Sequence, residues 1–209
     1  MKKTKNIRKT KLELEILMLK QKLKESKNEM KILKKNSRKF ERLALLDPLT
    51  KAGNRNLLKS ELIKNFDIAL RENSDFGLIL IDLDNLKIIN DRKGHNAGDN
   101  LIKNTINTLK HRIRQFDVLC RIGGDEFIII LFRSNLTETE NISKQLREIL
   151  KEQNISASFG YSSLREVAAK KLKVITKTEF SRLFKTLYFK IYKKADERLY
   201  KEKNLKKIQ

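Results

Sequence analysis

The chain has 209 residues, of which 39% are hydrophobic and 35% are charged. This length is enough for one substantial core with an extension, and no apolar run approaches the ~20 residues that span a bilayer. Cys120 is the only cysteine, which excludes an intramolecular disulfide and is typical of a reducing compartment. The sequence therefore predicts a cytoplasmic protein with one domain and an exposed helical extension.

The formal net charge of +22 raises nucleic acid or an anionic membrane surface as a partner. The excess of Lys and Arg lies in residues 1–40 and 165–209, whereas the middle of the chain is nearly neutral. Most of it is lysine distributed around expected helices with few aromatic residues, which is typical of a solvated helix face. Specific nucleic-acid or membrane binding is therefore disfavoured, and a basic scaffold that binds through both flanks is the alternative.

Residues 1–46 are expected to form a basic helical stalk. Apolar residues recur there with alternating spacings of four and three and without Pro or Gly, which indicates a parallel coiled coil about 50 Å long. The seam positions are Leu12, Ile16, Leu19, Leu23, Ser26, Met30, Leu33, Ser37, Phe40 and Ala44. The two serines weaken the seam, and dense lysine repels across it. We expect a homodimer through this stalk; the alternative is an amphipathic helix folded back on its own domain.

The segment after the stalk predicts a loop, a helix and a strand. Asp47-Pro48-Leu49-Thr50 breaks the first helix, because proline restricts the residue before it and lacks a backbone donor. Asn54 can cap a helix that ends at Asn73-Ser74-Asp75. Phe76–Leu83 is almost entirely apolar and predicts a buried strand. Asp82, near its end, is costly to bury unless it is paired or binds a metal.

The centre of the chain predicts a β-hairpin with acidic residues at its tip. Residues 85–92 are expected to form a short helix, and 94–99 a polar connection before a helix whose first turn would hold Asp99. Strands at 118–121 and 127–132 then flank Gly123 and Gly124, which permit a tight turn. By itself this stretch is more typical of an ordinary hairpin with a solvated acidic flank.

The last third predicts a helix, a strand and a long final helix. The helix covers residues 137–151, the strand 155–161 and the final helix 178–203, after a basic connection. Aromatic residues of the segment 162–194 are expected to pack in the core, with a partner-facing or membrane-facing surface as the alternative. Strands that alternate with helices around a central hairpin predict an α/β fold with a mixed or antiparallel sheet flanked by helices.

Three carboxylates are expected to meet at one edge of this sheet. Asp82 ends one strand, and Asp125 with Glu126 lies at the hairpin tip. Such a cluster repels itself unless divalent cations neutralise it, and hard oxygen ligands favour magnesium, with manganese possible. Metal-dependent phosphoryl or nucleotidyl transfer is the chemistry that this arrangement indicates.

Several motifs, in order, resemble the GGDEF family, the diguanylate cyclases of bacteria. Gly-Gly-Asp-Glu-Phe at 123–127 is similar to the family signature, and the resemblance covers about residues 47–207. The other matching stretches are Asp47–Thr50 with Asn54 and Arg55, residues 82–91, Gly94–Asp99, Ser158–Gly160 and Ala195–Lys203. The resemblance implies a palm-like, ferredoxin-related catalytic domain over residues 47–209.

The resemblance also implies a substrate, a product and roles for individual residues. Two GTP molecules would be condensed into cyclic di-GMP by a homodimer, with Asp82, Asp125 and the main-chain carbonyl of Leu83 binding magnesium. Glu126 would assist at the metal or in activating the 3′-hydroxyl. The remaining substrate contacts are Asn90 and Asp99 for guanine, Lys87, Lys203 and Lys207 for the triphosphate, and Gly123 and Gly124 for close approach to the nucleotide.

A product-inhibition site and two departures complete the comparison with the family pattern. Arg114 and Asp117 match its Arg-x-x-Asp motif, so both would bind cyclic di-GMP; a surface salt bridge is the alternative. Lys206 stands where the family usually has glycine, and Lys207 where it has arginine. Lysine keeps the charge but loses bidentate geometry.

A rival to the enzyme is an inactive GGDEF-like module that binds GTP or cyclic di-GMP and signals through its coiled coil.

Overall fold

The computed structural model describes residues 2–168 and 176–208, and it describes their side chains except those of residues 2–17, 38, 39, 41, 42, 177, 207 and 208. The chain divides into two compact units, Met1–Ala44 and Leu45–Gln209. None of the helices in the described ranges combines the length and the apolar character needed to cross a membrane.

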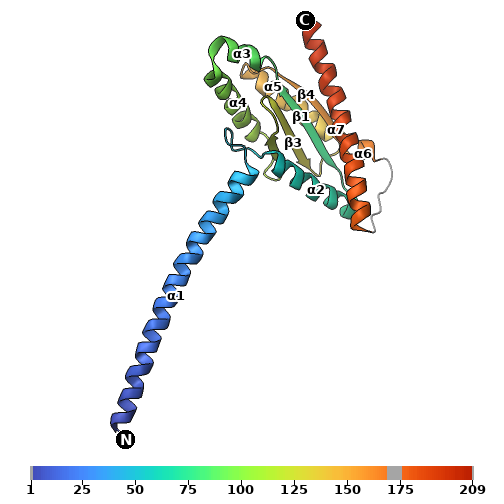
Figure 1. The fold of residues 1–209 in the computed structure, drawn as a ribbon. Coiled ribbons are helices and arrows are strands. Elements are labelled where there is room, and N and C mark those ends of the chain that lie inside the picture. The colour runs from blue at the N-terminus through green and yellow to red at the C-terminus, as the bar shows by residue number, and fades with distance from the viewer. Residues whose placement is uncertain (1, 169–175, 209) are drawn as a thin grey trace. The chain divides into compact units, whose positions relative to one another are not determined.

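The first unit is one helix, α1, which runs from Lys2 to Leu45 (Figure 1). Its predicted seam residues lie on the helix surface, where Leu33 and Phe40 are each 68% exposed. The side chains of Leu12 and Ile16, also assigned to the seam, lie outside the described ones. An isolated helix thus leaves a row of apolar side chains in contact with solvent.

The second unit is built on a four-stranded sheet. Its strands are β1 (Phe76–Leu83), β2 (Val118–Arg121), β3 (Glu126–Phe132) and β4 (Ala157–Ser163). The order is β2-β3-β1-β4, and each neighbouring pair is antiparallel (Figure 1). The predicted α/β fold is confirmed, and among the two sheet types expected the antiparallel one is found.

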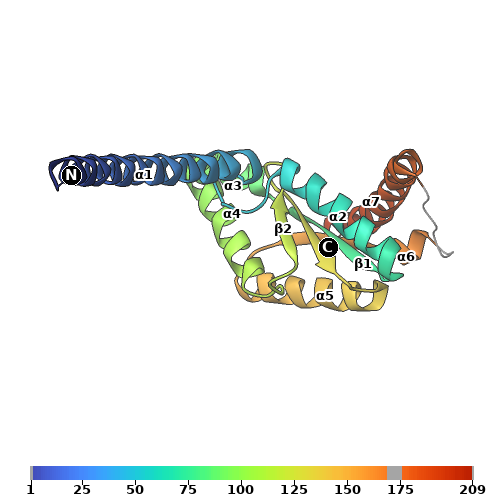
Figure 2. The same ribbon diagram turned by 90° about the horizontal axis from the view of Figure 1, so that it is seen from below.

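Helices cover both faces of the sheet. α4 (His95–Lys110) and α5 (Leu136–Glu152) pack on one face, and α2 (Arg55–Glu72) and α7 (Lys177–Ile208) on the other (Figure 2). Because side chains alternate along a strand, β1 sends Ile79 and Ile81 into the first layer and Leu78 and Leu80 into the second. Two short helices, α3 (Leu86–Lys93) and α6 (Leu164–Val167), complete the unit.

The elements begin and end close to their predicted positions, with three differences. Asn54 caps α2 as predicted, its side chain accepting bonds from the backbone N–H groups of Asn56 and Leu57. α4 begins at His95, so Asp99 lies beyond its first turn rather than in it. β4 runs from Ala157 to Ser163 rather than over 155–161, and α7 continues to Ile208. Part of the predicted connection, residues 169–175, lies outside the described residues.

α7 lies unusually close to β4. A Cβ atom at Gly160 would collide with the backbone carbonyl of Ala195 and would lie 2.7 Å from the nitrogen of Leu199. Only glycine therefore lets the helix backbone approach the strand at this point. The contact fixes where the C-terminal half of α7 lies along the sheet.

Candidate functional site

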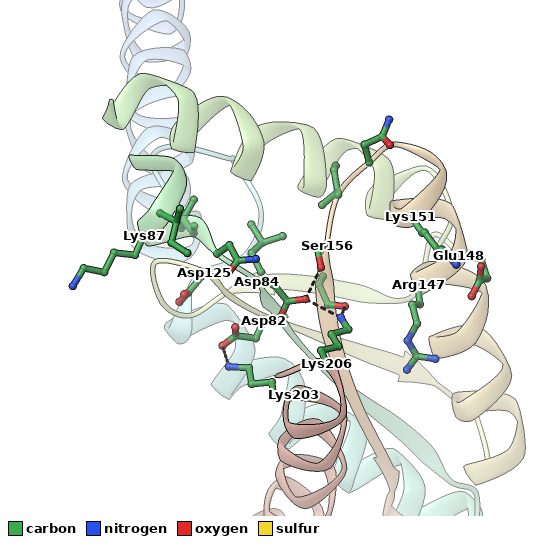
Figure 3. A pocket seen from close by; sticks show the side chains of 17 residues that line it. Asp82, Asp84, Lys87, Asp125, Arg147, Glu148, Lys151, Ser156, Lys203 and Lys206 are labelled. Atoms are coloured by element: carbon green, nitrogen blue, oxygen red, sulfur yellow. Dashed lines mark hydrogen bonds and ion pairs between the residues drawn. The ribbon is translucent and has the colours of Figure 1, made fainter. Parts of the chain in front are cut away.

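A polar cavity of about 1260 Å³ lies at the sheet edge where β1 ends (Figure 3). We call it the carboxylate cavity. It is lined by Asp82, Leu83, Asp84, Asn85, Leu86, Lys87, Ile88, Asp125, Arg147, Glu148, Lys151, Asn154, Ile155, Ser156, Ala157, Lys203 and Lys206. Its walls come from β1, α3, α5 and the C-terminal part of α7, so distant parts of the chain meet here.

Asp82 faces the α7 side of the sheet and is paired with a lysine. Its carboxylate lies 2.7 Å from Nζ of Lys203. Burial raises the pKa of Asp82, and the bond from Lys203 offsets only part of this effect, while Asp125 and Asp84 add repulsion. Asp82 is therefore an acid that its protein surroundings satisfy incompletely.

Asp84, two residues further along, is held by more partners. It accepts bonds from Lys206 Nζ at 2.8 Å and Ser156 Oγ at 2.7 Å (Figure 3). It also accepts a bond from Ser158 Oγ at 2.8 Å. Burial alone would raise the pKa of Asp84, but these donors together lower it. Lys206 also donates to the carbonyl of Ala157 at 2.6 Å. The end of α7 is thereby tied to both β1 and β4.

Asp125 belongs to the glycine turn, residues 122–125, which connects β2 to β3. Its backbone carbonyl accepts a bond from the N–H of Leu83 at 3.0 Å, so the turn lies directly against the end of β1. Asp82 and Asp125 both line the carboxylate cavity. The structure thus brings together the two side chains that the sequence analysis assigned to a metal.

The donors at this edge fit a divalent cation that takes further ligands from another molecule. Within the described ranges no three or more Asp, Glu, His and Cys side chains gather closely enough to hold a metal ion. Two carboxylates and the carbonyl of Leu83 are hard oxygen donors, and magnesium is commonly bound through one or two carboxylates plus substrate phosphates. In this structure the ammonium group of Lys203 is the cation that pairs with the Asp82 carboxylate.

Glu126 does not line the carboxylate cavity. In the register of the sheet it lies opposite Asp82, but its side chain lines a second pocket between α2 and α7. Its carboxylate folds back over the glycine turn, where a Cβ atom at Gly123 would collide with it. Gly123 therefore leaves room for the side chain of Glu126.

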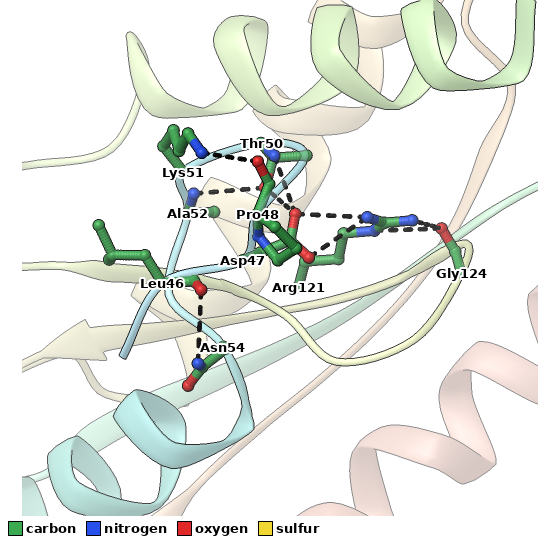
Figure 4. A network of polar contacts seen from close by, with 9 residues as sticks. All are labelled: Leu46, Asp47, Pro48, Thr50, Lys51, Ala52, Asn54, Arg121 and Gly124. Carbon is green, nitrogen blue, oxygen red and sulfur yellow. Dashed lines mark hydrogen bonds and ion pairs between the residues drawn. The ribbon is translucent and has the colours of Figure 1, made fainter. Parts of the chain in front are cut away.

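The glycine turn is also tied to the loop that follows α1, residues 46–54, here called the opening loop. Arg121 lies 3.3 Å from both carboxylate oxygens of Asp47, and its Nη2 donates to the carbonyl of Gly124 at 2.9 Å (Figure 4). Asp47 also accepts bonds from the backbone N–H and hydroxyl of Thr50 at 2.9 and 2.7 Å. Burial raises the pKa of Asp47, but Thr50 and Arg121 together lower it.

The other predicted substrate residues lie away from the two metal-site carboxylates. Asn90 in α3 and Asp99 in α4 do not line the carboxylate cavity, although the buried Oδ1 of Asn90 has no hydrogen-bond partner in the described part of the chain. Lys87 lines the cavity, but its side chain extends away from the carboxylates (Figure 3). The side chain of Lys207 lies outside the described ones.

The predicted product residues form a turn at the far end of the hairpin. The carboxylate of Asp117 accepts bonds from the backbone N–H groups of Arg114 at 2.9 Å and Phe132 at 3.0 Å. Arg114 is exposed, and within the described residues these two side chains form no ion pair with each other. The surface salt bridge considered as an alternative is therefore not what holds this turn.

Sequence reasoning missed the role of Lys206 and the full environment of Asp84. A signal for both exists in their spacing. Residues two apart on a strand share a face, which places Asp84 beside Asp82. Residues three apart on a helix also share a face, which places Lys206 beside Lys203.

Comparison with known proteins gives a consistent result. The family described as diguanylate cyclase, GGDEF domain, matches residues 44–209. Diguanylate cyclase DgcP of Pseudomonas aeruginosa is 38% identical over 104 residues, which are 50% of this chain and 16% of that protein. The chain spans less than a third of the length of the curated relatives it matches.

Solved structures share the fold. The coiled coil and GGDEF domain of DgcB from Caulobacter crescentus, in complex with c-di-GMP, gives a TM-score of 0.70 at 22% identity and covers 89% of this chain and 94% of that one. A microbial GGDEF domain studied with bis-(3,5)-cyclic di-GMP gives a TM-score of 0.61 at 31% identity, covering 78% of this chain and 93% of that one.

Proposed function

Because the chain belongs to the GGDEF domain family of diguanylate cyclases, we propose that it condenses two molecules of GTP into cyclic di-GMP. The observation that carries the proposal is the meeting of Asp82 and Asp125 in one lysine-lined cavity. Residues 47–209 form the catalytic domain in this proposal, and residues 1–46 the stalk. We place the reaction in the cytoplasm, which the single cysteine supports.

In the proposed reaction each 3′-hydroxyl oxygen attacks the α-phosphorus of the other GTP. The bond from that phosphorus to the oxygen bridging to the β-phosphate breaks, and pyrophosphate leaves twice for each cyclic di-GMP formed. Asp82, Asp125 and the carbonyl of Leu83 would hold magnesium, which supplies charge stabilisation at the phosphates. Glu126, next to Asp125, would accept the proton of the 3′-hydroxyl after its side chain turns away from the α2 side.

The lysines at the cavity are proposed to bind the triphosphate. Lys203 would exchange its bond with Asp82 for one with a phosphate oxygen, and Lys87 and Lys207 would add charge from α3 and the end of α7. Asn90 and Asp99 would read the guanine edge, because an aspartate accepts from the N1 and N2 donors that adenine lacks. The unpartnered Oδ1 of Asn90 supports its part in this assignment.

The reaction requires two copies of the chain, since one domain would hold one GTP and each hydroxyl attacks the other nucleotide. We propose that α1 brings the copies together as a coiled coil. The exposure of Leu33 and Phe40 supports this, because association would bury apolar surface that the single helix leaves in water.

The proposal is tested by incubating the purified chain with GTP and magnesium and separating the nucleotide products. We expect cyclic di-GMP with two equivalents of pyrophosphate. Asp125→Ala should abolish turnover, whereas Asp67→Ala, which removes a partly exposed acid of α2 that pairs with Arg71, should not. Circular dichroism checks that both variants are folded. Retained activity in Asp125→Ala would refute the assignment of this residue.

The same assay separates the enzyme from the inactive module. A wild-type chain that binds GTP or cyclic di-GMP but forms no cyclic dinucleotide would support the module. The pairing of Lys203 and Lys206 with Asp82 and Asp84 is the observation that favours this second candidate, because both lysines would have to yield to a metal-bound nucleotide.

Product inhibition is proposed to act through the exposed Arg114 and the adjacent Asp117. Arg114 can pair with a phosphate of cyclic di-GMP and stack on a guanine. Arg114→Ala should raise the inhibitory concentration of cyclic di-GMP by about tenfold, since one charged contact is lost. Asp117→Ala is a poor choice because this carboxylate also holds the turn. An unchanged inhibition curve for Arg114→Ala would remove the site from the proposal.

A further inference from the structure

A second pocket, of about 790 Å³, lies between α2 and α7 beside the glycine turn. We call it the aromatic pocket. Its lining residues are Arg55, Leu58, Lys59, Leu62, Ile63, Ile122, Glu126, Ile128, Phe180, Ser181, Phe184, Lys185, Tyr188 and Tyr192. Its volume lies within the range of about 300–1,000 Å³ that is usual for small-molecule sites.

The pocket has an apolar floor and an aromatic wall. Leu58, Leu62 and Ile128 form the floor and are buried. The wall consists of four rings spaced four residues apart on α7, at positions 180, 184, 188 and 192. Neighbouring rings lie 5.9–6.4 Å apart, and the first three are nearly parallel. Such a wall favours a ligand with a planar aromatic ring system, because aromatic rings attract one another in offset or edge-to-face contacts.

The charges around the pocket favour an anion. Arg55, Lys59 and Lys185 line it, against the single carboxylate of Glu126. None of these three cations forms an ion pair with an acid in the described ranges. Within the described residues the hydrogen bond of the Arg55 guanidinium is the one its Nε donates to the carbonyl of Ile122 at 2.6 Å. The cationic rim is thus not neutralised by the protein's own acids.

The polar atoms within the pocket can also donate to an anion. Burial raises the pKa of both Tyr188 and Tyr192, so their hydroxyls stay neutral at physiological pH and can donate hydrogen bonds. Convergent donors above an apolar floor are the arrangement that orients a ligand in small-molecule sites.

We propose that the aromatic pocket binds a planar, largely apolar small molecule that carries a carboxylate, phosphate or sulfonate group. The ring system lies against the wall of α7, and the anionic group lies among Arg55, Lys59 and Lys185. A bound molecule would contact the glycine turn, because Ile122, the first residue of that turn, and Glu126, which follows it, line the pocket. This regulatory consequence rests on the proposed cyclase function, whereas the binding itself does not.

The test uses 8-anilinonaphthalene-1-sulfonate, a fluorescent aromatic anion, with the full chain and without GTP. We expect saturable binding at one molecule per chain. Lys59→Glu combined with Lys185→Glu should weaken binding by about tenfold or more, since two attractive charges become repulsive. Lys190→Glu, at an exposed α7 position outside the pocket, is the matched control and should leave the affinity unchanged.

A steric variant and a neutral probe complete the test. Ile63 is 37% exposed at the pocket, so Ile63→Trp should fill the space and reduce binding without unfolding the chain. Phe189→Trp, at an exposed position of α7 outside the pocket, should not. N-phenyl-1-naphthylamine, which lacks the sulfonate, should bind more weakly than the anion.

Four results would overturn the proposal. They are non-saturable binding, equal affinity for the neutral probe, indifference to both the charge and the steric variants, and loss of probe binding as protein concentration rises, which would show a second copy in the pocket. Because the measurement involves no turnover, its outcome is independent of the cyclase assay.

Discussion

The opening loop and the carboxylate cavity each hold an aspartate beside the glycine turn, but the two aspartates differ in their hydrogen-bond partners and in the direction of their pKa shifts. Asp47 in the opening loop accepts bonds from Thr50 and Arg121, and its pKa is lowered. Asp82 in the cavity has one lysine partner, and its pKa is raised because burial prevails. The protein itself satisfies the first carboxylate, whereas the second has capacity left for a ligand.

This difference distinguishes a carboxylate that holds the fold from one that we propose binds a ligand, without reference to any relative. A carboxylate that is well supplied with donors favours its charged form and stabilises the fold that supplies them. A half-buried carboxylate with few donors and acidic neighbours costs stability, and that cost is recovered only when a cation binds. The contrast predicts opposite consequences for the same substitution at the two positions.

Asp82→Asn should give the largest effect, a loss of turnover of about 10³-fold. The variant would lose a carboxylate ligand of the proposed magnesium ion, which stabilises the negative charge at the phosphates. The free energy of unfolding should stay within about 1 kcal/mol of the wild type, since the burial of an incompletely satisfied charge is relieved as its lysine bond is lost. Initial rates and urea unfolding measure the two quantities. A large loss of stability would place Asp82 among the structural acids.

Asp47→Asn should do the reverse and lower the free energy of unfolding by about 2 kcal/mol at neutral pH, because charge-assisted bonds to Arg121 and Thr50 are lost. Turnover by the remaining folded protein should stay well above that of Asp82→Asn. Urea unfolding followed by circular dichroism gives the stability difference. Unchanged stability would contradict the structural role.

The Asp47 effect should depend on pH. A carboxyl group with a lowered pKa contributes stability that is fully present above its unfolded value of 3.8 and lost as pH falls through the folded value. The stability difference between wild type and Asp47→Asn should therefore be largest at neutral pH and shrink below pH 3.8. Equal differences at both ends of this range would show that charge is not involved.

The smallest effect concerns Cys120, which reports on the opening loop. Its thiol is buried, burial raises its pKa to about 12, and a Cβ atom at Gly53 would lie 2.5 Å from its sulfur. Iodoacetamide should therefore label Cys120 only slowly at pH 8, since both access and the thiolate are lacking. Asp47→Asn should accelerate labelling severalfold by loosening the loop, whereas Asp82→Asn should not. Rapid labelling of the wild type would contradict this packing.

Local signals in the sequence predict most of the fold. Phe76–Leu83 is a strand with the predicted ends, because its apolar run is bounded by polar residues. Asn54 begins α2 because its side chain caps the first N–H groups. The start of α4 at His95 was not predicted, since Gly94 and Gly98 suggested a loop, yet packing against α3 favours helix there.

The sequence allowed the acidic residues of the site to be identified, but not all of the contacts that surround them. Motif order identified Asp82 and Asp125, and the structure places both in one cavity. The side of the turn that Glu126 faces depends on strand register, and the partners of Asp84 depend on where α7 lies along the sheet. Both are tertiary relations that no local pattern fixes. Phe180, Phe184, Tyr188 and Tyr192 of α7 do pack against the core, as expected, and also form one wall of a pocket. Phe189, which was expected to pack there too, is exposed.

The close passage of α7 over Gly160 has a consequence for how insertions act in this chain. Ala195 is the contact point, and Lys203 lies about 12 Å further along the helix axis at 1.5 Å per residue. One residue inserted between them would rotate the following lysines by about 100° and carry both away from Asp82 and Asp84. The same insertion before Ala195 would leave them in place. The number of residues between the glycine contact and the two lysines is therefore constrained by the carboxylate cavity.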